Sequence, residues 1–542
     1  MAVNTNIDGS GSYSKLVQSF AARSQDSYLL CGSQYSKLAS RFYSSTGDTS
    51  SKGSNTSCPN GNFHFVTVMN LQVISSPDKK STDQHQVQVQ DFPNPQAFLD
   101  GPKVGPGCSQ LIFLKGYEST EWLKTIGAAL TVDPEFWRRH GPNYGQEFYD
   151  LPLLPSYCHG IVKLRIITIL NSRIAGTPTT VQRWRVDGKE IIRRHHIKLE
   201  KKGSEGESII RQLYMHSESV YTVEQHISCT VVQKNNGLIW LDVGKTPLPS
   251  IQVLSDEDYR SDMPDYCIPV IQPQIPKAAL IYPLSEIGPG HSPNGPNSRM
   301  TPSSTQSASL LPTQYGEGLK PLNMRISPLY AMSDIFRHAA YSSNQMVNML
   351  TLNIEEALRA AHRHEALSLS DLQFKKDMLD EHAAYLEEVV SFLKVGSKSW
   401  TDLNPDGSGA PNGANSSNTK QSSRENMQKA EEIASITQAE LLEDFNVLIQ
   451  RIEKLAARCK DGTDIILSRA QLRESQKGIE QAAEVKVLTI LVFFFAPLSF
   501  VTSIFGMSFV NVDWKIGVPI YVAISVALAI GLGIALTKQV RW

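Results

Sequence analysis

The sequence lacks an excess of charge of either sign, closely paired cysteines and a glycine-rich phosphate loop. Its 542 residues carry 52 Lys and Arg against 53 Asp and Glu, which argues against a nucleic-acid-binding protein that works through a general basic field. The seven cysteines lie far apart, with no Cys-x-x-Cys pair, as expected of reduced cytosolic thiols rather than of disulfides or a zinc site. A mean hydropathy of −0.23 excludes a polytopic transporter with most of its mass in lipid. The first residues also lack the apolar region of a cleavable secretory signal.

A folded soluble domain is expected between residues 62 and 282. Apolar, β-branched runs predict its strands, and amphipathic segments predict its helices. The predicted strands are 63–74, 111–114, 161–170, 227–232 and 238–243, and the predicted helices are 119–130 and 133–140. This mixture indicates an α/β or α+β fold.

Two long uncharged stretches lie near the end of the sequence. Residues 487–505 provide 19 consecutive uncharged positions, and residues 516–536 provide 21. A helix needs about 20 such residues to cross the ~30 Å hydrocarbon core of a bilayer. One stretch alone would also fit a buried core helix, but two that lie only ten residues apart predict a pair of membrane-spanning helices.

Basic residues lie before the first stretch and after the second, at the two outer ends of the pair. Arg473, Lys477 and Lys486 precede the first stretch, and Lys538 and Arg541 follow the second, whereas the loop between them has one Lys and one Asp. The positive-inside rule therefore predicts that both termini are cytoplasmic and that the loop lies on the other side. A Ser-rich start with few basic residues favours the plasma membrane over the mitochondrial inner membrane.

Small and hydroxyl side chains follow one face of the first stretch. Two helices cannot enclose a pore by themselves, so transport would require several subunits around an axis. The face is defined by positions that alternate at four- and three-residue spacing, namely Val485, Thr489, Val492, Ala496, Ser499 and Ser503. Such a face either lines a pore or packs against another helix, with its hydroxyls bonded to carbonyls one turn earlier, and the spacing leaves both open.

The segment before the first stretch has its own apolar pattern. Apolar residues recur at four- and three-residue spacing, with a glycine in one position, at Leu441, Phe445, Leu448, Ile452, Leu455, Cys459, Gly462 and Ile466. We call these eight positions the seam. A pattern of this length is typical of a coiled coil or of the core of a helix bundle.

These features give the following predicted order along the chain. It runs through a disordered Ser-rich tail at 1–61, a cytoplasmic α/β domain at 62–282, a Pro/Gly/Ser-rich linker at 283–332, a helical segment at 333–394, a disordered linker at 395–423, a stalk helix at 424–486, a first transmembrane helix at 487–505, an extracytoplasmic loop at 506–515, a second transmembrane helix at 516–536 and a cytoplasmic tail at 537–542.

Three motifs in the first stretch and its loop carry a family resemblance. Residues 484–509 read EVKVLTILVFFFAPLSFVTSIFGMSF and include KVLT, PLSF and FGMSF. With these motifs the chain resembles the CorA-type divalent-cation (magnesium) transporters. The segment RESQKGIEQA at 473–482 is similar to the stalk of fungal members, and residues 111–140 are similar to the start of the family's cytosolic domain.

The resemblance implies an assembly and an ion site. Family members are homopentamers with an α/β cytoplasmic funnel, a long stalk, an inner ring of first helices and an outer ring of second helices. A Gly-Met-Asn signature at the extracellular mouth binds the ion while it is still largely hydrated, which suits Mg²⁺ because that ion gives up its water reluctantly. Gly506 and Met507 match this signature. Asp513, the acidic side chain of the loop, either concentrates cations there or is a solvated charge.

The sequence departs from the family pattern at several positions. Ser508 stands where the family has Asn, and a hydroxyl is shorter and a weaker acceptor than an amide. Val485 and Ala496 stand where bulkier Met is usual in the gate, whereas Leu488 is retained. The basic cluster after the second stretch is reduced to Lys538 and Arg541. These departures bear on ion selectivity and on transport itself.

Other groups of reactive side chains form no recognisable site. His195 and His196 are expected on a strand, where neighbours point to opposite faces, and no further ligand is suitably spaced. His362 and His364 are expected on a helix but not on one face. The pair Cys158–His159 has no partner for nucleophilic catalysis, so no enzyme is predicted.

Acidic residues gather on the predicted stalk. They are Glu440, Glu443, Asp444, Asp461 and Asp464. The resemblance implies that such residues form cation-sensing sites between subunits, and the alternative is that each is a solvated helix charge.

The expected function is therefore passive entry of a divalent cation, first of all Mg²⁺, through a homo-oligomer in a lipid bilayer. Mg²⁺ or another divalent ion is expected as cargo and as a possible regulator, with no cofactor and no nucleic-acid partner. The alternatives are transport of Zn²⁺, Co²⁺ or Ni²⁺, or a degenerate, non-conducting scaffold or regulatory subunit.

Overall fold

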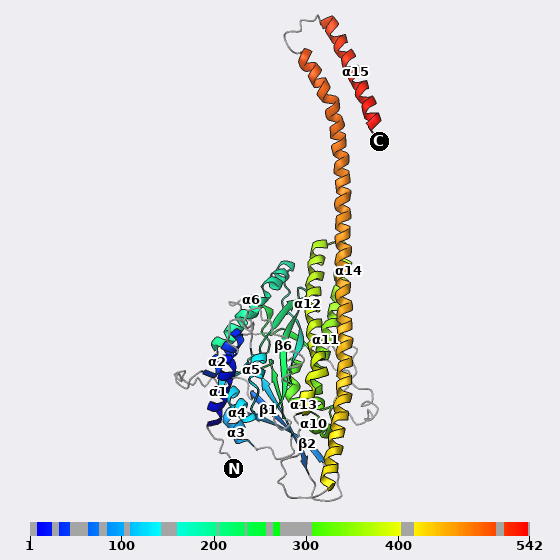
Figure 1. Cartoon of the computed structure of the whole chain (residues 1–542). Helices are drawn as coiled ribbons and strands as arrows, with labels where there is room; N and C mark the ends of the chain where they lie inside the picture. The colour runs from blue at the N-terminus through cyan, green and yellow to red at the C-terminus, as the bar shows by residue number, and fades with distance from the viewer. Residues whose placement is uncertain are drawn as a thin grey trace, which may run out of the picture. The chain divides into compact units, whose positions relative to one another are not determined.

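The structure is a computed structural model (Figure 1), and it describes residues 8–23, 32–43, 63–74, 84–101, 109–141, 160–202, 205–232, 236–245, 247–255, 264–270, 306–402, 417–505 and 514–539. These residues divide into two compact units. The first comprises 1–356 and 375–457, and the second comprises 357–374 and 458–542. Three long helices contribute to both units, namely α11 (Pro328–Ala360), α12 (Glu365–Ser391) and α14 (Ser417–Phe505).

A mixed β-sheet forms the centre of the first unit. The strands are β1 (Val66–Ile74), β2 (Gln84–Phe92), β3 (Ser109–Lys115), β4 (Ile161–Asn171), β5 (Gln212–Met215), β6 (Val220–Val232), β7 (Asn236–Leu241) and β8 (Tyr266–Ile268). Their order in the sheet is β2-β1-β3-β7-β6-β4-β8, and β5 pairs with β6. Strands β3 and β7 are parallel, while the other pairs are antiparallel. All five predicted strands are confirmed within this sheet.

The two predicted helices of this domain are also confirmed, and their caps explain where they begin. Helix α4 (Thr120–Leu130) follows Ser119, whose hydroxyl accepts a hydrogen bond from the Trp122 amide. Helix α5 (Pro134–His140) follows Asp133, whose carboxylate accepts from the Glu135 amide at 2.9 Å. Both caps bind backbone N–H groups that have no partner within the first turn.

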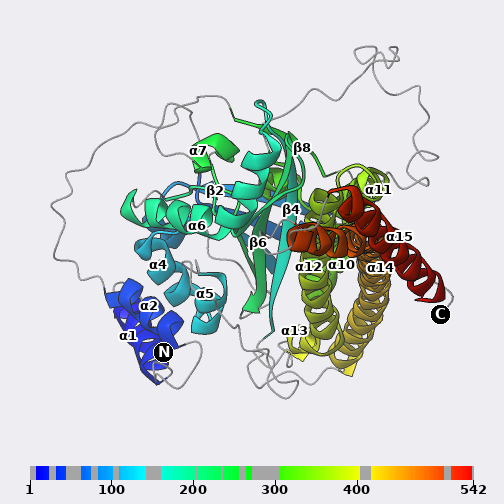
Figure 2. The same cartoon turned by 90° about the horizontal axis from the view of Figure 1, so that it is seen from above.

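Helices cover both faces of the sheet, as the view from above shows (Figure 2). Helices α4, α5 and α6 (Pro178–Lys202) lie on one side, and α11 and α12 lie on the other. Strand β4 is buried along most of its length, as expected of a strand that is covered on both faces. On the α12 side the Tyr385 hydroxyl donates to the Lys163 carbonyl of β4 at 2.9 Å.

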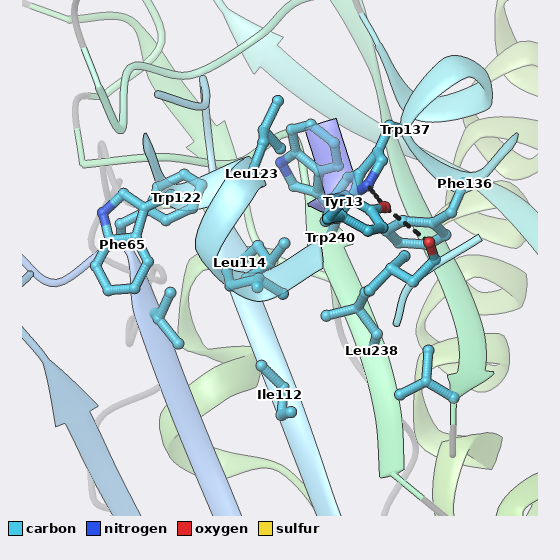
Figure 3. Packing of buried hydrophobic residues seen from close by; sticks show 14 of the residues in the cluster. Tyr13, Phe65, Ile112, Leu114, Trp122, Leu123, Phe136, Trp137, Leu238 and Trp240 are labelled. Carbon is cyan, nitrogen blue, oxygen red and sulfur yellow. Dashed lines mark hydrogen bonds between the residues drawn. The ribbon is translucent and has the colours of Figure 1, made fainter. Parts of the chain in front are cut away.

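The predicted disordered tail contains two helices in the structure, α1 (Asp8–Arg23) and α2 (Gly32–Tyr43). Tyr13 of α1 joins the aromatic core shown in Figure 3, where its hydroxyl donates to the Val132 carbonyl and accepts from Trp137 Nε1, both at 2.7 Å. Gly127 makes this approach possible, because a Cβ there would lie 2.0 Å from the Tyr13 ring. The few apolar residues of this Ser-rich segment are enough to hold the helix in place, because they pack against the aromatic core of the α/β domain.

The placement of His195 and His196 on a strand is wrong. Both lie in α6, a helix of 25 residues that the sequence reasoning did not predict. Thr177 caps its start, with its hydroxyl accepting from the Thr180 amide at 3.2 Å. Val181 and Trp184 of α6 lie at helical spacing among many charged residues, and they form an apolar side of the helix that packs on the sheet. His362 and His364 lie in the turn after α11 rather than within a helix.

The seam is buried along its whole length, which confirms the prediction of a packed helix face. In the first unit, Phe445 packs edge to face against Phe336 of α11, with ring centroids 6.5 Å apart. In the second unit, a Cβ on Gly462 would lie 2.3 Å from Cδ2 of Leu358, so a larger residue there would require the Leu358 side chain of α11 to move. The partners belong to the same chain, and the seam is therefore the core of an intrachain helix bundle.

Shorter elements complete the described chain. Those outside the two predicted linkers are α3 (Pro95–Asp100) and α7 (Ile251–Ser255), and those within or beside them are the 3₁₀ helix η3 (Ser307–Leu310), α9 (Leu311–Gln314), α10 (Pro321–Ile326), the π-helical turn η4 (Phe392–Gly396) and α13 (Lys398–Asp402). The last helix is α15 (Trp514–Gln539), with Pro519 inside it.

Candidate functional site

The predicted pore-lining residues all lie in the last part of α14. This part belongs to the second unit and continues without a break to Phe505. Its side chains have few neighbours within the described chain: Val485 and Leu488 are each 60% exposed and Val492 is 54% exposed. Thr489, Ala496, Ser499 and Ser503 are exposed as well.

A hydrogen bond within the helix sets the orientation of one hydroxyl on this face. Thr489 Oγ1 donates to the carbonyl oxygen of Val485, one turn earlier, at 2.7 Å. The sequence left open whether such hydroxyls bond their own helix or line a pore. The hydroxyl proton is used within the helix. The hydroxyl oxygen can still accept a hydrogen bond on its outer side, so the bond within the helix is compatible with a pore-lining role.

Apolar side chains are exposed on the other faces of the same segment too. Val487, Leu491 and Phe493 are each more than half exposed. Exposure of large apolar groups on every side of a helix is unfavourable in water, at roughly 25 cal/mol per Å². Further contacts from lipid or from other helices would therefore stabilise this part of α14.

The residues that precede the candidate site are held by contacts in the second unit. Arg473 Nη1 lies 2.6 Å from Glu365 Oε1, at the start of α12. Ile466 is buried and Gly462 lies against Leu358. The contact of Arg473 with Glu365 therefore holds α14 about three turns before Val485, at 3.6 residues per turn.

The predicted ion-binding residues fall outside the described part of the chain. Gly506, Met507, Ser508 and Asp513 all lie between α14 and α15, in residues 506–513. Cys158 and His159 also lie outside it. Their predicted roles stay predictions.

The acidic residues of α14 that were singled out do not converge on one place. Glu440 Oε2 pairs with Arg337 Nη2 at 3.1 Å. Burial raises the pKa of Asp444 above its usual value, and the neighbouring Glu440 and Glu443 add to this, although Arg337 opposes it. Asp461 and Asp464 are exposed. Within the described residues, no group of three or more His, Cys, Asp and Glu is arranged to hold a metal ion.

The sequence reasoning missed a buried ionic network in the first unit. Asp242 directly follows β7 and is fully buried, and Arg211 binds its two oxygens through Nε and Nη2, each at 2.7 Å. The His226 amide donates to the same carboxylate at 2.6 Å, and His140 Nε2 lies 3.1 Å from it. A signal was present in the sequence, because an aspartate follows directly after the apolar run LIWL.

The pKa values in this network follow from burial and pairing. Burial alone would raise the pKa of Asp242, but Arg211 and then His140 more than offset it and hold the pKa well below its usual range. Burial lowers the pKa of His140 to about 4, against the opposing effect of Asp242. The network therefore holds one carboxylate and one guanidinium in charged form and one imidazole in neutral form at pH 7.

A second buried carboxylate, Glu224 of β6, links the sheet to α12. Burial would raise its pKa, but Arg165 and then His226 lower the pKa to about 2. Arg165 lies over the Tyr385 ring, 4.4 Å from its centroid, and 3.4 Å from Glu381 of α12. Every charge is matched by a neighbour, which is typical of structural support rather than of a reactive centre.

Among the residues whose placement the structure describes, no helix contains a stretch both long enough and apolar enough to cross a membrane.

Comparison with known proteins places a similarity on the end of the chain that carries the candidate site. Residues 410–538 match the family model of the CorA-like Mg²⁺ transporter protein, a range that takes in α14 and nearly all of α15. The chain is also similar to the solved structure of the CorA magnesium transporter from Methanocaldococcus jannaschii, with 10% sequence identity, a TM-score of 0.34, and coverage of 88% of this chain and 98% of that chain. A search of curated proteins gives no match.

Proposed function

We propose that this chain is the subunit of a membrane channel that passes divalent cations, with Mg²⁺ as the first candidate, down their electrochemical gradient into the cytosol. The observation that carries the proposal is the match of residues 410–538 to a family model of Mg²⁺ transporters. The match falls on the two uncharged stretches at 487–505 and 516–536 and on the motif that joins them.

The proposal takes the two uncharged stretches as spans. In sequence they provide 19 and 21 consecutive uncharged positions, which meets the ~20 residues that a bilayer requires. Both termini are then cytoplasmic by the positive-inside rule, and the α/β domain lies on the same side. The plasma membrane is the proposed location.

Several copies of the chain are required, and a homopentamer is the proposed assembly. The exposed face of α14 with Thr489, Ser499 and Ser503 supplies a polar line for the axis. A hydrated divalent cation presents the hydrogens of its water molecules, which need acceptors. Because Thr489 donates its own proton to Val485, its oxygen is left to accept from such a water molecule. Val485, Leu488, Val492 and Ala496 supply apolar constrictions along the same line.

The mouth of the channel is proposed at the motif after α14. Gly506 and Met507 offer backbone carbonyls, and Ser508 offers a hydroxyl in place of an amide. Oxygen ligands suit Mg²⁺, and a ring of them recognises the hydrated ion without removing its water. Asp513 raises the local concentration of cations. The membrane potential drives entry, at ~2.3 kcal/mol per charge per 100 mV, so no nucleotide is needed.

Ser508 supports a second candidate function. Where an amide is replaced by a shorter hydroxyl, the ring at the mouth becomes wider and less selective. The chain would then pass Zn²⁺, Co²⁺ or Ni²⁺, or would act as a non-conducting scaffold or regulatory subunit. A divalent ion bound at the acidic residues of α14 is the proposed regulator in either case.

Metal uptake into cells that lack their own Mg²⁺ entry route tests the proposal. The natural chain and a Ser508→Asn variant are expressed to equal levels at the membrane, and Mg²⁺, Zn²⁺, Co²⁺ and Ni²⁺ entry is followed with fluorescent reporters. Entry of Mg²⁺ with the natural chain supports the first candidate. Entry with only the variant identifies a degenerate channel. If neither chain passes any of the four ions while both reach the membrane as oligomers, the channel proposal is overturned.

A further inference from the structure

A small cavity lies beside α6, in the first unit. It has a volume of about 280 Å³ and is lined by Arg183, Trp184, Asp187, Ile191 and Arg194 of α6 and by Ser255 at the end of α7. The α6 residues follow helical spacing, so they share one face of the helix. A volume slightly below the ~300–1,000 Å³ of drug-sized pockets suits a small ionic ligand.

Two of the four arginines of α6 are used by the protein, and the other two line the cavity. Arg193 binds Glu190 at 2.6 Å, and Arg185 donates to the Met215 carbonyl at 2.8 Å. Within the described residues, neither Arg183 nor Arg194 forms an ion pair or donates a side-chain hydrogen bond, and Glu190, on which the charge of Arg194 also acts, is paired with Arg193. Two unpaired guanidinium groups beside one cavity are typical of a site for an anion, because their forked donors match phosphate oxygens.

Donors that lack acceptors lie beside the same cavity. Arg194 Nε and Trp184 Nε1 are both shielded from solvent and have no hydrogen-bond partner among the described residues. Trp184 is only 5% exposed, so water does not readily supply the missing acceptor. Buried donors in folded proteins are nearly always satisfied, and two orphans at one cavity point to an acceptor-rich occupant.

Helix α6 has an excess of positive charge, which also favours an anionic ligand in this cavity. Helix α6 carries eight Lys and Arg against three Asp and Glu. Asp187 is the carboxylate among the lining residues, and it forms no ion pair with Arg183 or Arg194 in the described chain. The cavity therefore keeps a net positive charge.

We propose that this cavity binds a phosphate group, held by the guanidinium groups of Arg183 and Arg194 with Trp184 Nε1, which has no acceptor in the described chain, as a further donor. The phosphate belongs either to a free phosphorylated molecule or to a lipid headgroup, since both present the same oxygens. The site is separate from the proposed ion path, and its occupancy does not depend on whether the chain conducts.

Calorimetric titration of the detergent-purified full chain with inorganic phosphate tests the site, with chloride at equal ionic strength as the reference. Arg183→Gln and Arg194→Gln are each expected to weaken phosphate binding at least tenfold. Arg193→Gln is the matched control, because it removes the same charge from the same helix at an arginine that is already paired. It is expected to change the affinity less than twofold. Circular dichroism checks that each variant is folded.

Two further measurements complete the test. The first distinguishes a lipid headgroup from a free phosphate, and the second follows phosphate binding by tryptophan fluorescence. Binding to phosphatidylcholine vesicles that contain on the order of 5 to 10 mol% of a phosphoinositide is compared with binding to free phosphate. Tighter binding to these vesicles than to vesicles of phosphatidylcholine alone identifies a lipid headgroup as the ligand. Tryptophan fluorescence is expected to change on phosphate addition in the natural chain and to stay constant in Trp184→Phe.

Three results would overturn the proposal. The first is the absence of phosphate binding by the natural chain. The second is equal weakening by Arg193→Gln and Arg194→Gln, which would indicate only a general basic field. The third is binding that appears only when Asp256, Glu257 and Asp258, which follow Ser255 in sequence, are changed to amides, because the chain's own carboxylates would then be the occupant.

Discussion

Thr489 donates its hydroxyl proton to the carbonyl oxygen of Val485 at 2.7 Å, one turn back along α14. A threonine that does this satisfies its donor inside the helix and presents an oxygen acceptor on the helix surface. The proposed channel uses this acceptor for the water shell of a cation, so the pair relates the local geometry of one helix to the proposed function.

Removal of that acceptor is expected to reduce ion passage. Thr489→Val keeps the shape of the side chain but has no oxygen, and we expect cation entry to fall several-fold, since a lost hydrogen bond costs about 0.5–1.5 kcal/mol at each of several symmetric positions. Thr489→Ser is expected to retain entry. Reporter fluorescence at equal surface expression measures both.

Thr502→Val is the matched control for this change. Thr502 lies off the face that carries Thr489 and donates to the Ser499 carbonyl at 3.2 Å. Equal loss of entry in Thr489→Val and Thr502→Val would contradict a specific role for the Thr489 oxygen.

Truncation of the seam is expected to destabilise the intrachain bundle. Ile452 is fully buried, and Ile452→Ala should cost about 2–5 kcal/mol through lost burial and a new cavity. Ile436→Ala removes the same atoms from the same helix at a position that is 54% exposed, and it should cost much less. Thermal unfolding of the purified chain compares the two. Similar losses in both variants would show that the seam is not the core of the bundle.

The ion pair of Asp242 and Arg211 is expected to be costly to break from one side. Asp242→Asn leaves a buried guanidinium without its charge partner, which typically destabilises a protein by about 3–5 kcal/mol. The double variant Asp242→Leu with Arg211→Met removes both charges and should be more stable than Asp242→Asn. Chemical unfolding of the two variants and the natural chain checks the order. A double variant less stable than the single one would contradict it.

The buried His140 is expected to make stability depend on pH. Its pKa is lowered to about 4 from 6.5, so between these values the unfolded chain binds a proton that the folded chain does not. Stability should therefore be lost as pH falls from about 6.5 towards 4, by up to ~3 kcal/mol from this residue at 1.36 kcal/mol per pKa unit.

Unfolding experiments at about pH 7.5, 6 and 5, which lie on both sides of the ordinary His pKa of about 6.5, measure this dependence. His140→Gln should flatten it in part, because His216 and His226 also have pKa values lowered mainly by burial. His364→Gln, at an exposed position in the turn after α11, should leave the slope unchanged. A natural chain that becomes more stable as the pH falls would contradict the assigned sign.

The sequence was sufficient for the parts of the fold that have a strong local pattern. The strand that ends at Leu241 and the helix capped by Ser119 follow from apolar periodicity and cap chemistry. The seam was also predictable, because Leu441 and its partners repeat at helical spacing. The sequence did not show that the partners of this seam lie in α11 and α12 of the same chain, since a pattern on one helix does not identify what packs on it.

Other parts were not predictable because they depend on distant contacts. Helix α1 forms in a Ser-rich segment where Tyr13 finds the Val132 carbonyl 119 residues away. Helix α6 carries too many charges for its few apolar residues to stand out, and His195 was therefore assigned to a strand. At the candidate site the sequence indicated the face of α14, but the hydrogen bond of Thr489 required the structure.

Mg²⁺ flux into proteoliposomes tests the central claim most directly. The purified natural chain is reconstituted into vesicles that contain a Mg²⁺ indicator, and a potential negative on the indicator side is imposed. The account predicts Mg²⁺ entry that grows with the potential and falls several-fold in Thr489→Val. Vesicles with the oligomeric natural chain that stay as tight to Mg²⁺ as protein-free vesicles would contradict it.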